Sequence, residues 1–261
     1  MLRAGAVRGV PVAEAKPGPK SKKQKAAPTG RLLFEPVKLA SRFSDEVIVS
    51  FSGGKDSVVV LDLCVRYFKR VHVFFMYQVP GLSFQEATLR WYEDRYGLKI
   101  HRVPHPELAE WLRLGLFRHE DWSVPAIGFN DLYHYVRVVT GGWWIAAGER
   151  IADSIWRRAM MKRAGSVDRL RGRFYPLMYW RKEDVLRYIA QRRLKVSPEG
   201  KYLGHSFRSL EPEEMFLTKL NYPADFAKIE RWFPFVGAAV MKFEMENADR
   251  VRVMAGRREG R

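Results

Sequence analysis

Short apolar runs alternate with amphipathic stretches along most of this chain. The run at 47–49 stops at paired glycines and apolar residues resume at 58–61, a pattern that predicts a buried strand, a tight turn and a helix. The same reasoning predicts further strands at 71–76, 98–103 and 141–148, and helices at 56–69, 83–96, 132–139, 156–163 and 182–191. Residues 104–124 and 167–173 have no regular period, so we expect irregular structure in the first and a basic loop in the second.

The order of these elements predicts the fold class. Strands that alternate with helices pair in parallel through right-handed crossovers. We therefore expect an α/β fold, a doubly wound and mostly parallel sheet, over residues 32–210. Two helical stretches after Glu211 predict a small helical C-terminal extension over 211–261. Residues 1–31 are rich in Pro, Gly, Ala and Lys, a composition that predicts a disordered basic tail.

The segment between the first strand and helix, Ser50-Phe51-Ser52-Gly53-Gly54-Lys55-Asp56-Ser57, has the composition of a phosphate-binding turn. The two glycines have no Cβ, so the backbone can turn sharply and present N–H groups to an anion at a helix N-terminus. The alternative is a capped turn without a ligand, but six specific residues in this order behind a buried strand favour binding. The predicted phosphate-binding residues are Ser52, Gly53, Gly54, Lys55 and Ser57. Asp56 is predicted to be catalytic and to hold Mg²⁺ against the phosphates.

A basic cluster follows the fourth predicted strand, which ends near Gly148. Residues 149–173 contain eight Lys or Arg and three acids. Guanidinium groups bind phosphate through paired hydrogen bonds, and open parallel sheets place ligands at the carboxyl ends of their strands. Arg150 and Arg157 are therefore predicted to act on the same anion, with Gly148 beside it. The alternative is a solvated helix face, and we expect residues 162–173 to face solvent or a polymer.

Composition limits location and partners. No apolar run approaches the roughly 18 residues of a membrane span, and the N-terminus lacks the pattern of a secretory signal. The single cysteine, Cys64, fits a reducing compartment, so we expect a cytoplasmic protein with no membrane partner. Most of the net charge of +17 lies at the ends, +7 in residues 1–31 and +4 in residues 250–261. Such tails either keep a chain in solution or contact DNA or RNA.

The motifs of this chain resemble those of the phosphoadenosine phosphosulfate (PAPS) reductase family. They follow in unbroken order from about residue 44 to 208. The family belongs to the PP-loop superfamily, which also includes ATP pyrophosphatases. The loop resembles the family's Ser-Gly-Gly-Lys-Asp-Ser turn. The later matching residues are Gly148, Arg150, Asp153, Ser154, Arg157 and Arg158; Pro176, Trp180, Asp184, Val185, Tyr188 and Ile189; and Tyr202, Gly204 and Ser206. The resemblance implies binding of ATP or a related adenine nucleotide with Mg²⁺, and His205 is a further predicted nucleotide contact.

Two departures from the family bear on activity. PAPS reductases use a cysteine near the C-terminus, and this chain has none after Cys64, which lies in the predicted helix core. The family's Asp-Thr-Gly after the second strand is replaced by Tyr77-Gln78-Val79. Sulfonucleotide reduction is therefore the least favoured activity.

Two interpretations stay open from the sequence. One is an ATP pyrophosphatase-type enzyme that adenylates an acceptor, in nucleic-acid modification or sulfur transfer, with any sulfur supplied by a partner. The other is a non-catalytic nucleotide-binding module that regulates or assembles with a protein partner.

Overall fold

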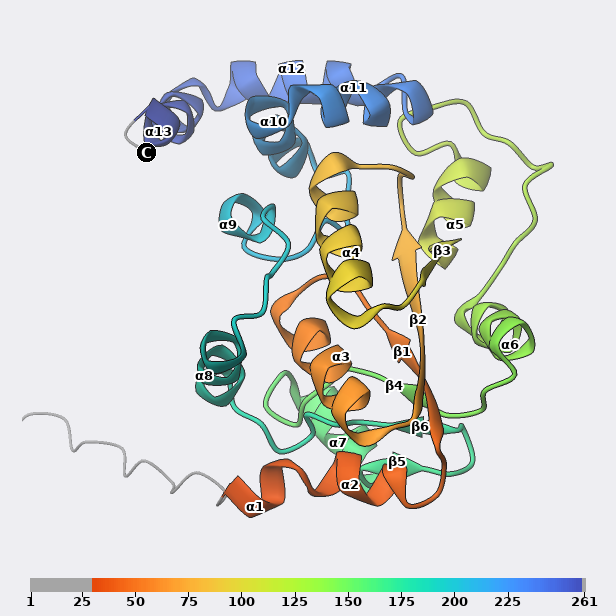
Figure 1. The fold of residues 1–261 in the computed structure, drawn as a ribbon. Helices are drawn as coiled ribbons and strands as arrows, with labels where there is room; N and C mark the ends of the chain where they lie inside the picture. The colour runs from red at the N-terminus through yellow and green to blue at the C-terminus, as the bar shows by residue number, and fades with distance from the viewer. Residues whose placement is uncertain (1–29, 260–261) are drawn as a thin grey trace, which may run out of the picture.

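The computed structural model describes residues 30–259 (Figure 1). Most of the predicted basic tail at 1–31 therefore lies outside the described residues. No described helix is long and apolar enough to cross a membrane.

A six-stranded, mostly parallel sheet forms the centre of the fold. Its order is β3-β2-β1-β4-β6-β5, and the β5–β6 pair alone is antiparallel. The strands are β1 (Glu46–Ser50), β2 (Arg70–Tyr77), β3 (Ile100–Pro104), β4 (Ile145–Ala146), β5 (Val167–Asp168) and β6 (Arg173–Phe174). The chain runs outward from β1 through β2 to β3 and then returns to the other side of β1, which confirms the doubly wound arrangement predicted from the sequence.

Helices cover both faces of this sheet (Figure 1). The larger core contains α2 (Glu35–Ser41), α3 (Lys55–Tyr67), α4 (Ser83–Tyr96) and α8 (Lys182–Arg192). On the opposite face, α6 (Phe129–Thr140) packs Leu132 and Val136 against Ile48, Phe74 and Ile145 of the sheet. Two more helices, α5 (Pro106–Leu114) and α7 (Ile155–Ala164), follow β3 and β4.

Three local expectations were wrong. The fourth strand, expected at 141–148, is reduced to two residues. The expected loop at 167–173 contains the short strand β5 and the start of β6, and strands of two residues are too short to show a period. The expected irregular segment at 104–124 begins with α5, which Pro106 opens and Gly115 ends in a left-handed conformation.

The C-terminal region is helical and has a core of its own. It consists of α9 (Gly200–Leu203), α10 (Pro212–Asn221), α11 (Pro223–Trp232), α12 (Val236–Glu246) and α13 (Ala248–Glu259). This core also takes in Val79, Leu82 and Phe84, so the region is joined to the start of α4. Both carboxylate oxygens of Asp225 accept hydrogen bonds from the Ser83 N–H, at 2.8 and 2.9 Å. The extension thus caps the first turn of α4.

Asp62 links three helices of the larger core. It is fully buried in α3 and accepts hydrogen bonds from the hydroxyls of Tyr96 in α4 and Tyr188 in α8, both at 2.6 Å. Arg192 adds a bond from Nε at 3.1 Å. Burial alone would raise the pKa of Asp62, but these donors outweigh it and hold the pKa below its ordinary value.

Removing this carboxylate should lower the free energy of unfolding. We expect Asp62→Ala to cost about 2–4 kcal/mol, because two buried hydroxyls and one guanidinium lose their acceptor. A group with a lowered folded-state pKa stabilises above its unfolded pKa of about 3.9, and the contribution disappears as pH falls through the folded value. Urea denaturation should therefore show a difference between variant and parent that shrinks at acid pH. Asp94→Asn on the exposed side of α4 is the control, and an equal effect there would contradict this role.

Candidate nucleotide and acceptor site

The turn between β1 and α3 has the conformation that the sequence predicts. Gly53 has a φ of +73°, in the left-handed region that favours glycine. The Ser57 hydroxyl accepts hydrogen bonds from the Ser52 N–H at 3.2 Å and the Ser52 hydroxyl at 3.1 Å, and it donates to the Gly54 carbonyl at 3.0 Å. The turn is therefore closed on itself and leads directly into the first turn of a 13-residue helix.

A second segment, residues 197–199, packs against the turn. Ser197 donates its N–H to the Gly53 carbonyl at 2.9 Å, and a Cβ on Gly53 would lie 3.2 Å from the Ser197 Cβ. The Ser197 hydroxyl bonds to the buried carboxylate of Glu199. Burial raises the pKa of Glu199 although that hydrogen bond opposes the shift. No sequence motif marks Ser197 or Glu199 as part of the site.

Gly54 faces the segment that follows α9. A Cβ on Gly54 would lie only 2.6 Å from the Ser206 hydroxyl oxygen, so the close approach requires glycine. The neighbouring His205 turns away toward the C-terminal helices. Its Nε2 lies 3.1 Å from the Glu214 carboxylate of α10, and it does not line the cavity described below. Nucleotide contact by His205 thus stays a prediction that this arrangement does not favour.

Asp56 is the centre of an ion-pair chain that joins the turn to the segment after β4. Lys55 Nζ lies 2.6 Å from Asp56 Oδ2, and Arg150 Nε lies 3.2 Å from Asp56 Oδ1. Asp153 then pairs with Arg150 Nη2 at 2.7 Å and with Arg157 Nη1 at 3.0 Å. Two carboxylates therefore flank the buried Arg150, while half of the Arg157 side chain stays exposed to solvent.

Gly148 lies against this chain of ion pairs. A Cβ there would be 3.4 Å from the Cβ of Asp56, which is an ordinary contact, so the position does not demand glycine.

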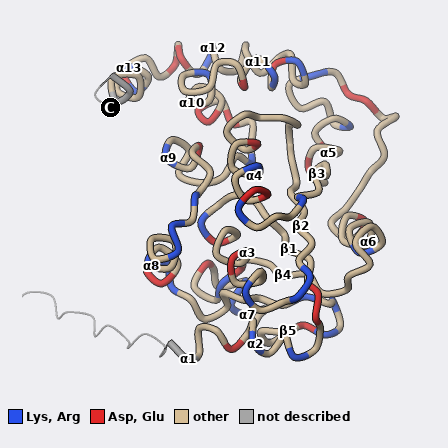
Figure 2. Tube along the Cα trace, in the orientation of Figure 1, with Lys and Arg blue, Asp and Glu red and all other residues tan. Residues whose placement is uncertain are grey.

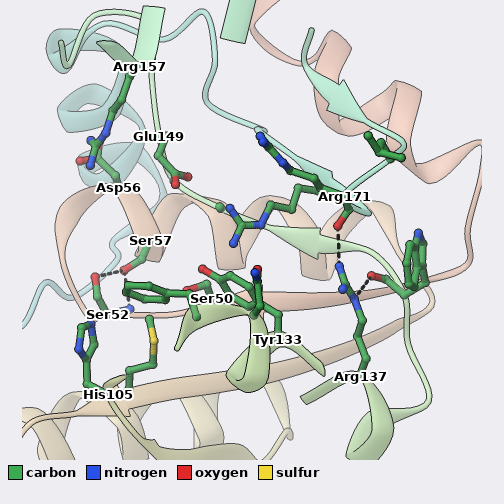
Figure 3. Close-up of a pocket in the computed structure, with 18 residues that line it drawn as sticks. Ser50, Ser52, Asp56, Ser57, His105, Tyr133, Arg137, Glu149, Arg157 and Arg171 are labelled. Carbon is green, nitrogen blue, oxygen red and sulfur yellow. Dashed lines mark hydrogen bonds between the residues drawn. The ribbon is translucent and has the colours of Figure 1, made fainter. Parts of the chain in front are cut away.

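A cavity of about 950 Å³ lies beside these groups, at the carboxyl ends of β1 and β4. Here the chain order reverses across the sheet, which is where open α/β sheets bind ligands. The lining residues at one end include Ser52, Asp56, Ser57, Gly148 and Arg157. Figure 3 shows Tyr133, Arg137 and Arg171 at the other end.

Two carboxylate oxygens in the cavity wall lack a hydrogen-bond partner among the described residues, Asp56 Oδ1 and Glu149 Oε2. Arg150 Nε is close to the first of them but is not aligned for a hydrogen bond. Glu149 was not predicted as a site residue. Its only signal is its position directly after Gly148 at the end of β4.

The far end of the cavity includes two arginines of the segment that was expected to face solvent or a polymer. Arg171 and Arg173 line the cavity together with Arg137, and 60% of the Arg171 side chain is still exposed to solvent. Arg137 Nη2 donates to the Arg171 carbonyl at 2.6 Å, so α6 and the β5–β6 turn meet here. Nothing in the local sequence connects these residues, because β4, α7 and β5 lie between Arg137 and Arg171 in the chain.

The chain is similar to known proteins. The family model of the phosphoadenosine phosphosulfate reductase domain matches residues 46–198. A comparison with curated proteins gave no match.

Three solved structures are similar to the chain. The U34-tRNA thiolase NcsA from Methanococcus maripaludis, with its 4Fe-4S cluster, is 16% identical with a TM-score of 0.44, over 78% of each chain. The NH3-dependent NAD synthetase from Campylobacter jejuni, in complex with nitrate, is 10% identical with a TM-score of 0.41, over 81% of this chain and 93% of that one. The PAPS reductase from Candida auris, in a phosphate complex, is 17% identical with a TM-score of 0.46, over 68% and 86%.

A side chain on Gly54 should disturb the turn. We expect Gly54→Val to weaken the binding of inorganic pyrophosphate by about tenfold or more, because the Cβ must displace Ser206 or the turn itself. Isothermal titration calorimetry would measure the affinity. Gly256→Val is the control, since a Cβ at this helical position meets no atom within 4 Å. Unchanged affinity in Gly54→Val would place the anion elsewhere.

Proposed function

Because the chain belongs to the phosphoadenosine phosphosulfate reductase domain family, we propose that it is an ATP pyrophosphatase-type enzyme that adenylates an acceptor. The observation that carries this proposal is the cavity at the β1–β4 switch point. There the hydroxyls of Ser52 and Ser57, at the helix N-terminus that follows the glycine turn, and the guanidinium of Arg157 line one space, which Gly53, Gly54 and Lys55 do not themselves line. Backbone N–H groups, hydroxyls and a guanidinium are the groups that bind a polyphosphate.

In the proposed reaction a nucleophilic oxygen of the acceptor attacks the α-phosphorus of ATP. The new P–O bond forms as the bond from the α-phosphorus to the α,β-bridging oxygen breaks, and pyrophosphate leaves with that electron pair. Arg157 and Lys55 would stabilise the charge that develops on the leaving group. Arg150 is buried between Asp56 and Asp153, so its first role would be to position Asp56.

The cavity also fits Mg²⁺. The ion usually binds proteins through one or two carboxylates, together with water and substrate phosphates. Asp56 Oδ1 and Glu149 Oε2 provide two such oxygens without hydrogen-bond partners among the described residues. These residues would hold the ion, which would neutralise phosphate charge.

Sulfonucleotide reduction is not supported, because the thiol is in the wrong place. Cys64 is the single cysteine of the chain and is completely buried within α3. Burial raises the pKa of its thiol, which disfavours the thiolate that would attack sulfur. Any sulfur transferred to the acceptor would have to come from a partner.

A non-catalytic nucleotide-binding module is the second candidate. Asp56 Oδ2 is already paired with Lys55 at 2.6 Å, and Gln78 stands buried where the family has a nucleotide-binding Asp-Thr-Gly. In that case the chain would act as a regulator or assembly partner of another protein. Under either candidate we expect a cytoplasmic location, with DNA or RNA contacted through the basic ends at 1–31 and 250–261.

The two candidates differ in pyrophosphate release. We expect ATP to release pyrophosphate when tRNA or single-stranded DNA is supplied, and Asp56→Asn to slow release by about 10²-fold or more, since one charge that organises the phosphates is lost. A coupled phosphatase assay measures release, and calorimetry measures ATP affinity. Asp249→Asn, fully exposed in α13, is the matched control. ATP binding that depends on Asp56 without any release would support the module instead.

Reduction of PAPS offers an independent test. We expect no sulfite from PAPS and thioredoxin, since the buried Cys64 thiol cannot reach a nucleotide in the cavity. Sulfite detected with the parent chain and lost in Cys64→Ala would overturn both this exclusion and the core role of Cys64.

A further inference from the structure

The end of the cavity formed by Arg137, Arg171 and Arg173, which we call the arginine end, carries an excess of positive charge. Among the described residues neither Arg137 nor Arg173 forms an ion pair with a carboxylate, and Arg171 has only Asp168 at 3.7 Å. Arg137 instead donates from Nε to the Trp143 carbonyl at 2.9 Å and from Nη2 to the Arg171 carbonyl at 2.6 Å. Carbonyls fix the guanidinium in place but leave its charge uncompensated.

The guanidiniums of Arg137 and Arg173 also repel one another. Burial lowers the pKa of Arg137, and repulsion by Arg173 lowers it further. A protein can hold like charges beside a cavity when a bound anion compensates them. Glu149, a carboxylate of the cavity wall, forms no ion pair with either arginine among the ion pairs of the described residues. An anion at the arginine end would therefore supply the missing counter-charge.

Aromatic rings stand directly beside these cations. The Arg173 guanidinium lies 4.1 Å from the centre of the Tyr133 ring, and Arg137 lies 4.3 Å from that of Trp143. Half of the Trp143 side chain is exposed to solvent. The Tyr133 ring is half-buried and stacks on Phe129, so Trp143 is the more accessible of the two rings. A cation beside an accessible ring forms the kind of surface that binds a phosphate backbone and stacks the adjacent base.

The basic surface continues beyond the cavity. Figure 2 shows Lys and Arg gathered along α7 and at the β5 end of the sheet, and the exposed members include Arg158, Lys162, Arg163 and Arg169. Within this surface Trp156 is 87% exposed and Leu170, a cavity-lining residue, is 91% exposed. A ligand confined to the cavity would not explain the exposed Trp156, which lies outside it. A strand that passes from the surface into the cavity would contact both.

We propose that the arginine end binds a phosphodiester of a single-stranded nucleic acid, with the adjacent base against Trp143 or Tyr133. In combination with the proposed function, that strand would be the acceptor, because the arginine end and the phosphate turn open into one cavity (Figure 3). The binding itself does not depend on the nucleotide. It can therefore be tested separately from the adenylation reaction.

The test is fluorescence anisotropy with the full chain and a single-stranded oligonucleotide of about 12 nucleotides, as DNA and as RNA, without ATP. We expect Arg171→Gln and Arg173→Gln each to weaken binding by about fivefold and to reduce the slope of log affinity against log salt by about 0.7, because each removes one phosphate contact. Arg171→Lys should restore the slope, since it restores the charge. Arg171 is 60% exposed, so its variants keep the test independent of folding.

Arg187→Gln provides the matched control, because Arg187 lies outside the cavity on the exposed surface of α8 and pairs with Asp184 at 3.7 Å, as Arg171 pairs with Asp168. Equal losses in Arg171→Gln, Arg173→Gln and Arg187→Gln would overturn the proposal. It would also be overturned if polyglutamate competed as well as the oligonucleotide, or if AMP or inorganic phosphate bound in an Arg173-dependent way while the oligonucleotide did not.

Photocrosslinking locates the strand. An oligonucleotide containing 5-iododeoxyuridine should crosslink to Trp143 or Tyr133, as identified by mass spectrometry, and crosslinks found only in the basic ends would contradict the site. ATP affinity measured on the same variants separates the two proposals. If ATP binds but oligonucleotide binding does not depend on the arginines, the strand site is wrong and the adenylation proposal is unaffected. If the oligonucleotide binds through the arginines but ATP does not bind, the adenylation proposal is wrong and the strand site is unaffected.

Discussion

A side chain at either glycine of the turn from β1 into α3 would force a neighbouring serine to shift, and the surrounding site depends on that close packing. Gly53 adopts a positive φ against Ser197, and Gly54 lies against Ser206. Both serines come from segments more than a hundred residues later in the chain, so the turn is fixed by tertiary packing as well as by its own hydrogen bonds. A rigid turn keeps the N-terminus of α3 open toward the cavity, where its dipole favours an anion.

Charge in the cavity is arranged in two unequal parts. Near the turn, Asp56 and Asp153 compensate Lys55, Arg150 and Arg157 through a continuous chain of ion pairs. Such a chain positions groups accurately but leaves little net charge. At the arginine end the guanidiniums are held by backbone carbonyls and aromatic rings, which do not neutralise them. The ion pairs near the turn therefore position the side chains there, whereas the uncompensated positive charge at the arginine end favours an anionic ligand.

Predictions from the sequence succeeded where neighbouring residues decide the structure. The helix ending at Tyr96 was placed correctly because Gly97 takes a left-handed conformation at its C-terminus. The buried position of Cys64 followed from the apolar residues around it. The predictions failed for β5 and β6, since two-residue strands carry no period, and for α5, where Trp111 and its aromatic neighbours obscured the helical pattern.

The sequence by itself determined the order of β1, α3, β2, α4 and β3, the glycine turn, and the position of Asp56 and Ser57 at the start of α3. These features depend on backbone conformation and short-range periodicity, which adjacent residues encode. Only the tertiary structure decided that His205 turns toward α10 and that Arg137 joins Arg173 in one cavity wall. Such contacts depend on how α6, the sheet and the C-terminal helices pack together. Packing brings residues that are distant in the sequence into contact through the shapes of whole helices and strands. The residues next to each of them in the sequence do not predict such contacts.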